Sequence, residues 1–101
     1  MKGKERADLR GEAHHLDVTV HIGQQGITPA LVQALDDALR THELVKSQVG
    51  KHLELEAKQA ANRLALQVGA EVVQVIGRTF TLYRQNPDLP RKPGAPPPWR
   101  R

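Results

Sequence analysis

The chain contains no cysteine, which excludes a disulfide framework and a thiolate metal site. This absence is consistent with a reducing compartment, and we expect a cytoplasmic protein. No apolar run approaches the ~20 residues needed to span a bilayer. The N-terminus also lacks the apolar stretch of a signal peptide. We therefore expect no contact with a membrane.

Aromatic residues are scarce, since Phe80, Tyr83 and Trp99 are the only ones besides histidine. Sheets that bind nucleic acid by base stacking present two or more bunched aromatic side chains. With so few aromatic residues, we do not expect a base-stacking surface.

Residues suited to catalysis or metal binding are also few. The nucleophile candidates are Ser47 and scattered threonines, and no base-and-orienter pair accompanies them. The five histidines lack the HxH or HxxxH spacing of a metal site, and we expect packing or helix-end hydrogen bonds for His14 and His42. Three acids are expected to be solvated charges on or beside a helix face: Asp36, Asp37 and Glu43. We expect no enzyme activity, metal, cofactor or small-molecule substrate.

Proline marks a change in the character of the chain, because six of the seven prolines follow residue 86. The sequence therefore predicts one folded domain over residues 1–84 and a Pro-rich, flexible tail over residues 85–101. Five of the 15 basic residues and one of the 11 acidic residues lie in 84–101, which leaves ten of each before it. The net charge of +4 thus comes from residues 84–101. A flexible basic end suits a polyanion such as RNA, or serves only solubility.

Hydrophobic periodicity predicts seven elements in the order α-β-α-β-α-β-β. Helices are predicted over residues 4–13, 28–42 and 53–68, and strands over 17–22, 44–49, 72–76 and 79–83. Gly77 and Arg78 between the last two strands favour a type II′ hairpin. Right-handed crossovers give parallel neighbours, and the final hairpin adds an antiparallel strand. The predicted fold is a two-layer α/β domain with a four-stranded mixed sheet.

Both long helices are predicted to cover one face of this sheet. The core beneath them would hold these strand residues: Val18, Val20, Ile22, Val45, Val49, Val73, Val75, Phe80 and Leu82. The opposite face would be polar: Thr19, His21, Lys46, Gln48, Gln74, Thr81 and Tyr83. That face could be solvated, could contact RNA, or could lie partly under the N-terminal helix.

The most informative segment joins the first strand to the second helix. It contains two glycines spaced as GxxG, Gly23 and Gly26, followed by a helix start at Thr28 and Pro29. Glycines allow a sharp turn, and the free N–H groups of a first helical turn favour anions. Modules that clamp a single-stranded nucleic-acid backbone use a GxxG loop in this way. From the spacing alone, a plain tight turn is an equal alternative.

Four motifs in order carry a family resemblance. The segments 9–16, 22–28, 42–46 and 73–79 resemble the LKxxAHxL opening, the GxxG loop, the HELIK segment and the VQVIGKT hairpin of the YhbY-like, or CRM-domain, RNA-binding proteins. Leu82, Tyr83 and Arg84 then follow the hairpin as they do in that family. Together the motifs cover about residues 9–84.

The resemblance implies a fold similar to the C-terminal domain of translation initiation factor three. It also implies RNA binding through the GxxG loop and nearby basic residues. Stand-alone bacterial members are associated with precursors of the large ribosomal subunit, and a single domain with a short tail is similar to these. Gln24 and Gln25 stand where many relatives carry a basic residue.

The resemblance and the charge pattern give one set of expected RNA-binding residues: Gly23, Gln24, Gln25, Gly26, Thr28, Lys46, Arg78, Arg10 and Arg6. Lys46 could instead pair with a neighbouring acid, and Arg78 could be an ordinary charged residue at a hairpin tip. Arg6 and Arg10 would extend the basic surface from the first helix, or be solvated charges.

We therefore expect a monomeric cytoplasmic protein that binds ribosomal RNA in precursors of the large subunit and assists ribosome assembly. Backbone clamping predicts modest sequence specificity. The alternative is a protein-interaction module that docks through its polar sheet face or its Pro-rich tail.

Overall fold

The computed structural model describes residues 3–89 and 94–100. The helices are α1 (Gly3–Ala13), α2 (Pro29–His42) and α3 (Ala57–Val68), with a short 3-10 helix, η1, at Pro98–Arg100. The strands are β1 (Val18–Ile22), β2 (Leu44–Val49), β3 (Glu71–Ile76) and β4 (Thr79–Tyr83). The predicted order of the first seven elements is confirmed. Within the described ranges, none of the helices has the length and apolar character of a bilayer-spanning segment.

The four strands form one mixed sheet in the order β1-β2-β4-β3. β1 and β2 are parallel, whereas β4 pairs antiparallel with both β2 and β3. The predicted hairpin is confirmed: Gly77 has a φ of +56° and Arg78 has no positive φ, as a type II′ turn requires. The expectation of parallel neighbours holds for β1 and β2 but not for β2 and β3, because β4 lies between them.

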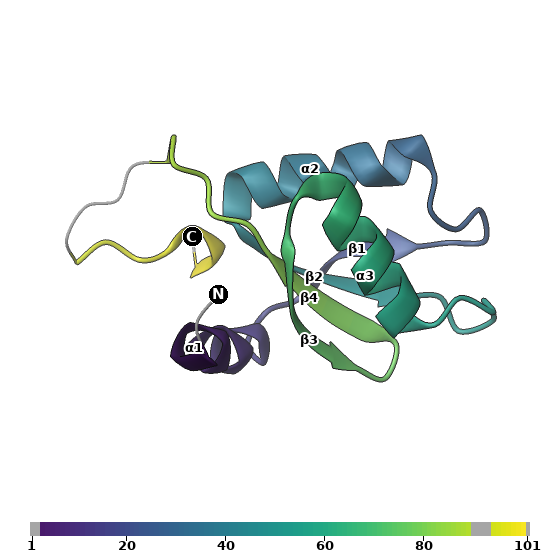
Figure 1. The fold of residues 1–101 in the computed structure, drawn as a ribbon, viewed down its shortest axis with the longest axis horizontal. Helices are drawn as coiled ribbons and strands as arrows, with labels where there is room; N and C mark the ends of the chain where they lie inside the picture. The colour runs from purple at the N-terminus through teal and green to yellow at the C-terminus, as the bar shows by residue number, and fades with distance from the viewer. Residues whose placement is uncertain (1–2, 90–93, 101) are drawn as a thin grey trace.

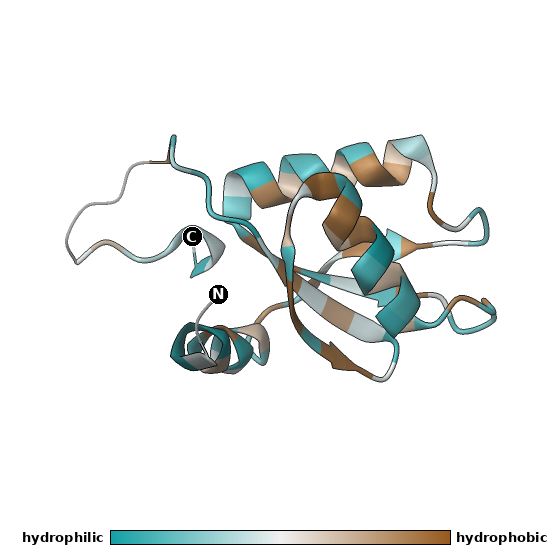
Figure 2. Ribbon diagram, viewed as in Figure 1, coloured by the Kyte–Doolittle hydropathy of each residue, from teal (hydrophilic) through white to brown (hydrophobic). Residues whose placement is uncertain are grey.

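Both long helices cover one face of the sheet, as predicted, and α1 lies on the other face (Figure 1). The apolar stripes of α2 and α3 face the sheet and leave polar residues outward (Figure 2). The main core joins Leu35 and Leu39 of α2, Leu64 of α3, and Phe80 and Leu82 of β4. α3 begins four residues later than predicted, because the loop before it, and not a helical turn, brings two leucines against the core: Leu53 and Leu55.

A bulge in β3 changes which of its side chains reach the core. Val72 pairs with Leu82 and Gln74 pairs with Thr81, so Val73 is an extra residue between two regular pairs. Val73 is therefore buried on the face that α1 covers, and the prediction that it lies under the long helices is wrong. Val75 follows at the sheet edge and is 37% exposed, so it is not a core residue either.

A second irregularity affects the start of β1. The register between β1 and β2 shifts between Val18 and Val20, and Val18 pairs with Lys46. Val18 is only partly buried and does not belong to the main core. The alternation predicted from Val18 onward is therefore correct only for Val20 and Ile22, which are buried under the helices.

The second sheet face has its own small apolar cluster, formed by Leu9, Leu44 and Val73. Tyr83 and Trp99 pack against this cluster, and their rings meet edge to face with centroids 6.2 Å apart. η1 contacts both α2 and β2, so the end of the segment predicted as a tail lies against the domain. The Trp99 indole covers apolar surface of the sheet that α1 leaves exposed at this point. Arg91 and Lys92 of the predicted tail lie outside the described residues.

Two charged residues near the end of α2 have structural roles that the sequence does not predict. Glu43 was expected to be solvated, but it is fully buried and its carboxylate accepts a hydrogen bond from the Asn86 N–H at 2.7 Å. Arg84 donates to the carboxylate of Asp36 at 2.7 Å and to the carbonyl of Val68 at 2.7 Å. The hydrogen bond from Arg84 to the Asp36 carboxylate holds the pKa of Asp36 below its usual range. Arg84 thus ties α2 and α3 to the end of β4, and Asp37, by contrast, is exposed as expected.

Candidate nucleic-acid interface

The GxxG segment forms a tight turn at the end of β1. The Gly26 N–H donates to the Gly23 carbonyl at 2.9 Å, which leaves Gln24 and Gln25 exposed at the tip. Gly26 has a φ of +69°, a conformation that glycine adopts without steric cost. Gly23 has no positive φ, and a Cβ placed on it would meet no atom within 4 Å. The turn therefore requires glycine at Gly26 but not at Gly23.

The helix that follows starts as its sequence predicts. Thr28 is the N-cap residue of α2, with its side-chain oxygen accepting from the Leu31 N–H at 3.1 Å, and Pro29 follows at the first helical position. The hydroxyl of Thr28 is thus already engaged in holding the helix start. The hydrogen of this hydroxyl group is not used in the cap and is available as a donor.

Several amides of this segment have no acceptor among the residues that the structure describes. Within the described residues, the N–H groups of Gln24, Gln25 and Ala30 form no hydrogen bond. All three residues are exposed. Unpaired amides beside a helix N-terminus carry partial positive charge and bind anions. The turn and the start of α2 thus form a surface suited to a phosphate group.

Two backbone hydrogen bonds fix neighbouring loops beside the GxxG turn. The Gly50 N–H donates to the Ile22 carbonyl at 3.0 Å, and the Val49 N–H donates to the Arg78 carbonyl at 2.8 Å. The turn, the loop after β2 and the tip of the β3–β4 hairpin consequently lie at the same end of the sheet, on the right in Figure 1. This end brings Arg78 close to the GxxG turn. It also brings Lys51, an exposed residue that the sequence did not point to.

Gly50 is the second residue of this end that was not predicted. A Cβ on it would lie 3.3 Å from the Ile22 carbonyl oxygen, closer than most side-chain contacts allow. The available signal was a glycine placed directly after a predicted strand, which can mark a close approach of two backbones.

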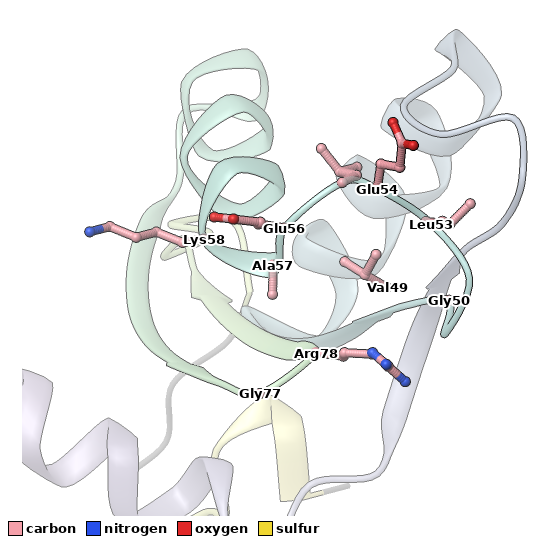
Figure 3. Close-up of a pocket in the computed structure, with 10 residues that line it drawn as sticks. Val49, Gly50, Leu53, Glu54, Glu56, Ala57, Lys58, Gly77 and Arg78 are labelled. Atoms are coloured by element: carbon pink, nitrogen blue, oxygen red, sulfur yellow. The ribbon is translucent and has the colours of Figure 1, made fainter.

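A shallow depression of about 360 Å³ lies on the helix side of this end, between β2, the hairpin tip and the start of α3. Two acids line it, Glu54 and Glu56, together with Lys58 and Arg78. In Figure 3 the Arg78 side chain extends from the hairpin tip toward Gly50, whereas the Lys58 side chain points away from it. Arg78 therefore belongs to the end that carries the GxxG turn, and Lys58 does not.

The other predicted basic residues are spread over the molecule. Lys46 lies on β2, on the face opposite the long helices, and forms no ion pair with any described residue. Arg6 and Arg10 are exposed on α1, which packs over Leu44 at the start of β2. Because the GxxG turn lies beyond the end of β1, next to the end of β2, these two arginines lie at the opposite end of the sheet.

The described residues form no catalytic or metal-binding site from the candidates that the sequence offered. Ser47 is fully buried opposite Phe80, on the face under the long helices. Among residues 3–89 and 94–100, no three His, Cys, Asp or Glu side chains are grouped to hold a metal ion.

The comparison with protein families decides the membership of the chain. The model of the CRS1/YhbY (CRM) domain matches residues 1–84. The chain belongs to this family. The match includes the GxxG turn and ends at Arg84, so this CRM domain contains α1, all four strands and both long helices.

Similar proteins carry names that refer to RNA. An "RNA-binding protein" of Haemophilus influenzae is 36% identical over an alignment of 97 residues that covers 91% of this chain and 97% of that protein. YqeI of Bacillus subtilis, named "Probable RNA-binding protein", is 30% identical over 85% of this chain and 90% of that protein. The solution structure of SAV1595 from Staphylococcus aureus, described as a candidate RNA-binding protein, matches with a TM-score of 0.75 and 33% identity. That match covers 87% of this chain and 92% of SAV1595.

Proposed function

We propose that this CRM-domain protein binds single-stranded ribosomal RNA in precursors of the large ribosomal subunit and assists their assembly. The observation that carries the proposal is the set of unpaired amides at the GxxG turn and the start of α2, beside Arg78. The names of the relatives support RNA as the partner. The ribosomal part depends on the resemblance to stand-alone bacterial members of the family.

The binding mode follows from the chemistry of the turn. Gln24 and Gln25 supply amide groups and no charge, so they can donate to phosphate or sugar oxygens without reading bases. Arg78 and Lys46 supply the positive charge. Two aromatic rings on the second sheet face, Tyr83 and Trp99, pack into an apolar cluster and do not form an open stacking platform. We therefore propose backbone recognition with modest sequence preference, by a monomeric cytoplasmic protein that needs no cofactor and catalyses no reaction.

The sharpest test compares two substitutions in the turn that differ in charge but impose nearly equal backbone strain. Gly26→Asp and Gly26→Asn impose nearly equal strain at a φ of +69°, because both residues tolerate the left-handed region and have the same shape. Only Asp opposes a phosphate. One like charge at ~4 Å costs about 1 kcal/mol in water, so we expect Gly26→Asp to bind labelled polyuridylate about fivefold more weakly than Gly26→Asn.

Fluorescence anisotropy at low salt measures both affinities, and circular dichroism verifies that both variants are folded. Equal affinities for polyuridylate would show that no phosphate lies at the turn. Crosslinking of bound RNA in cells, followed by sequencing, tests the ribosomal assignment. If capture of cellular partners persists after nuclease treatment, a protein-interaction role is favoured instead.

A further inference from the structure

The second face of the sheet is divided into a covered end and an uncovered end. α1 and Trp99 cover the end at Leu44, Val73 and Tyr83. In the described part of the chain, no helix lies over the other end, next to the hairpin tip, as Figure 1 shows. The uncovered side chains, which we call the open half, come from all four strands: His21, Lys46, Gln48, Gln74, Ile76 and Thr79.

The open half adjoins the GxxG turn directly. His21 is exposed two residues before Gly23 and pairs with Gln48 across β1 and β2. Gln48 pairs in turn with Thr79 of β4. Lys46 lies two residues further along β2, about 7 Å away at the usual strand rise. An RNA strand that leaves the turn on this side therefore meets the polar side chains of His21 and Gln48 first and the Lys46 cation next.

The chemistry of the open half suits a single-stranded polyanion. None of its six side chains is acidic. Lys46 forms no ion pair with a described residue, so its charge is available to a ligand. Ile76 is 52% exposed and offers an apolar contact to a base, while the two glutamine amides donate and accept hydrogen bonds.

The opposite exit from the turn offers a phosphate no excess of positive charge. On the helix side lies the depression lined by Glu54 and Glu56, both of which are exposed (Figure 3). Arg78 and Lys58 line the same depression, so its lining carries as many bases as acids. The Lys58 side chain lies on this side but points away from Arg78. The open half carries a cation and no acid, so it is the more favourable of the two directions for an RNA strand that leaves the turn.

We propose that single-stranded RNA held at the GxxG turn continues across the open half, past His21 and Gln48 to Lys46. This inference rests on the proposed function and adds the direction of the bound strand. The path ends where Thr81, fully buried, and the Tyr83–Trp99 cluster close the face.

Two lysines provide a matched test, because Lys46→Gln and Lys58→Gln remove the same charge on opposite sides of the turn. Each lost phosphate contact lowers the slope of log K against log salt by about 0.7 for single strands, which corresponds to roughly eightfold in affinity at 50 mM salt. For a labelled uridylate 12-mer, we expect this loss with Lys46→Gln and no change with Lys58→Gln. Lys46→Arg retains the charge and should retain the affinity and the slope.

Urea unfolding of each variant verifies that the sheet is intact. An unchanged slope in folded Lys46→Gln overturns the proposed path, and so does an equal loss in Lys58→Gln. The comparison of Gly26→Asp with Gly26→Asn separates this failure from failure of the turn as an RNA site. If the Gly26 pair differs in affinity while Lys46→Gln has no effect, the turn binds RNA and the strand takes another direction.

Discussion

The backbone N–H of Gly50 donates to the Ile22 carbonyl at 3.0 Å, and a Cβ on Gly50 would lie 3.3 Å from the same oxygen. This contact joins the loop after β2 to the base of the GxxG turn. Since Gly50 has no positive φ, the need for glycine comes from the close approach of two backbones and not from its own dihedral angles.

We predict that Gly50→Ala lowers the free energy of unfolding by about 1 kcal/mol, the cost of a modest steric overlap in a packed region. Either the hydrogen bond lengthens or Ile22 shifts, and both move the turn. Urea unfolding measures the change. Gly23→Ala is the matched control, because its Cβ meets no atom within 4 Å, and we expect a change within 0.5 kcal/mol there. Equal stability of the two variants would contradict the close-approach explanation.

Local pattern was sufficient to predict most of this fold. The alternation in β2 and β4, the cap at Thr28 and the glycine at Gly77 each depend on residues close together in the chain, and each is found where it was predicted. Strand order and side-chain facing in β3 were not predictable in this way. The position of β4 between β2 and β3, and the bulge at Val73, are set by packing between distant segments.

The candidate site shows the same division. The turn itself was predictable from the sequence, because its two glycines and the helix cap lie within one short segment. The residues around the turn were not predictable, since Gly50 and Arg78 are brought to this end of the sheet by hydrogen bonds between separate loops. Arg6 and Arg10 share the charge of the site but not its location, because composition carries no information on which end of the sheet a helix covers.

Glu43 provides a second prediction, since it combines full burial with a φ of +66°. Glu43→Ala and Glu43→Gly both remove the carboxylate that accepts the Asn86 N–H. At most positions the glycine variant is the less stable of the two, but here the positive φ costs alanine roughly 1 kcal/mol. We therefore expect Glu43→Gly to be more stable than Glu43→Ala by about that amount in thermal or urea unfolding. The reverse order would show that the backbone strain at this position is relieved in solution.

Trp99 provides the third prediction, because it is the only tryptophan and reports on the end of the chain. It is partly buried beside Tyr83, and Arg100 next to it forms an ion pair with Glu12 of α1. We expect Trp99 emission to be blue-shifted from that of a solvated indole, and less quenched by acrylamide. Arg100→Gln removes the ion pair and should move both signals toward the solvated values.

The same contact predicts a dependence on pH with a definite sign. The hydrogen bond from Arg100 holds the pKa of Glu12 below its usual range. The contribution of this carboxylate to docking is therefore complete at neutral pH, and it is lost as the pH falls from about 4.3, the usual glutamate value, through the lowered one. Trp99 emission should shift to the red over that range in the wild type, and Glu12→Gln should abolish the transition. An emission maximum that already matches solvated indole at pH 7 would contradict the docked position of η1.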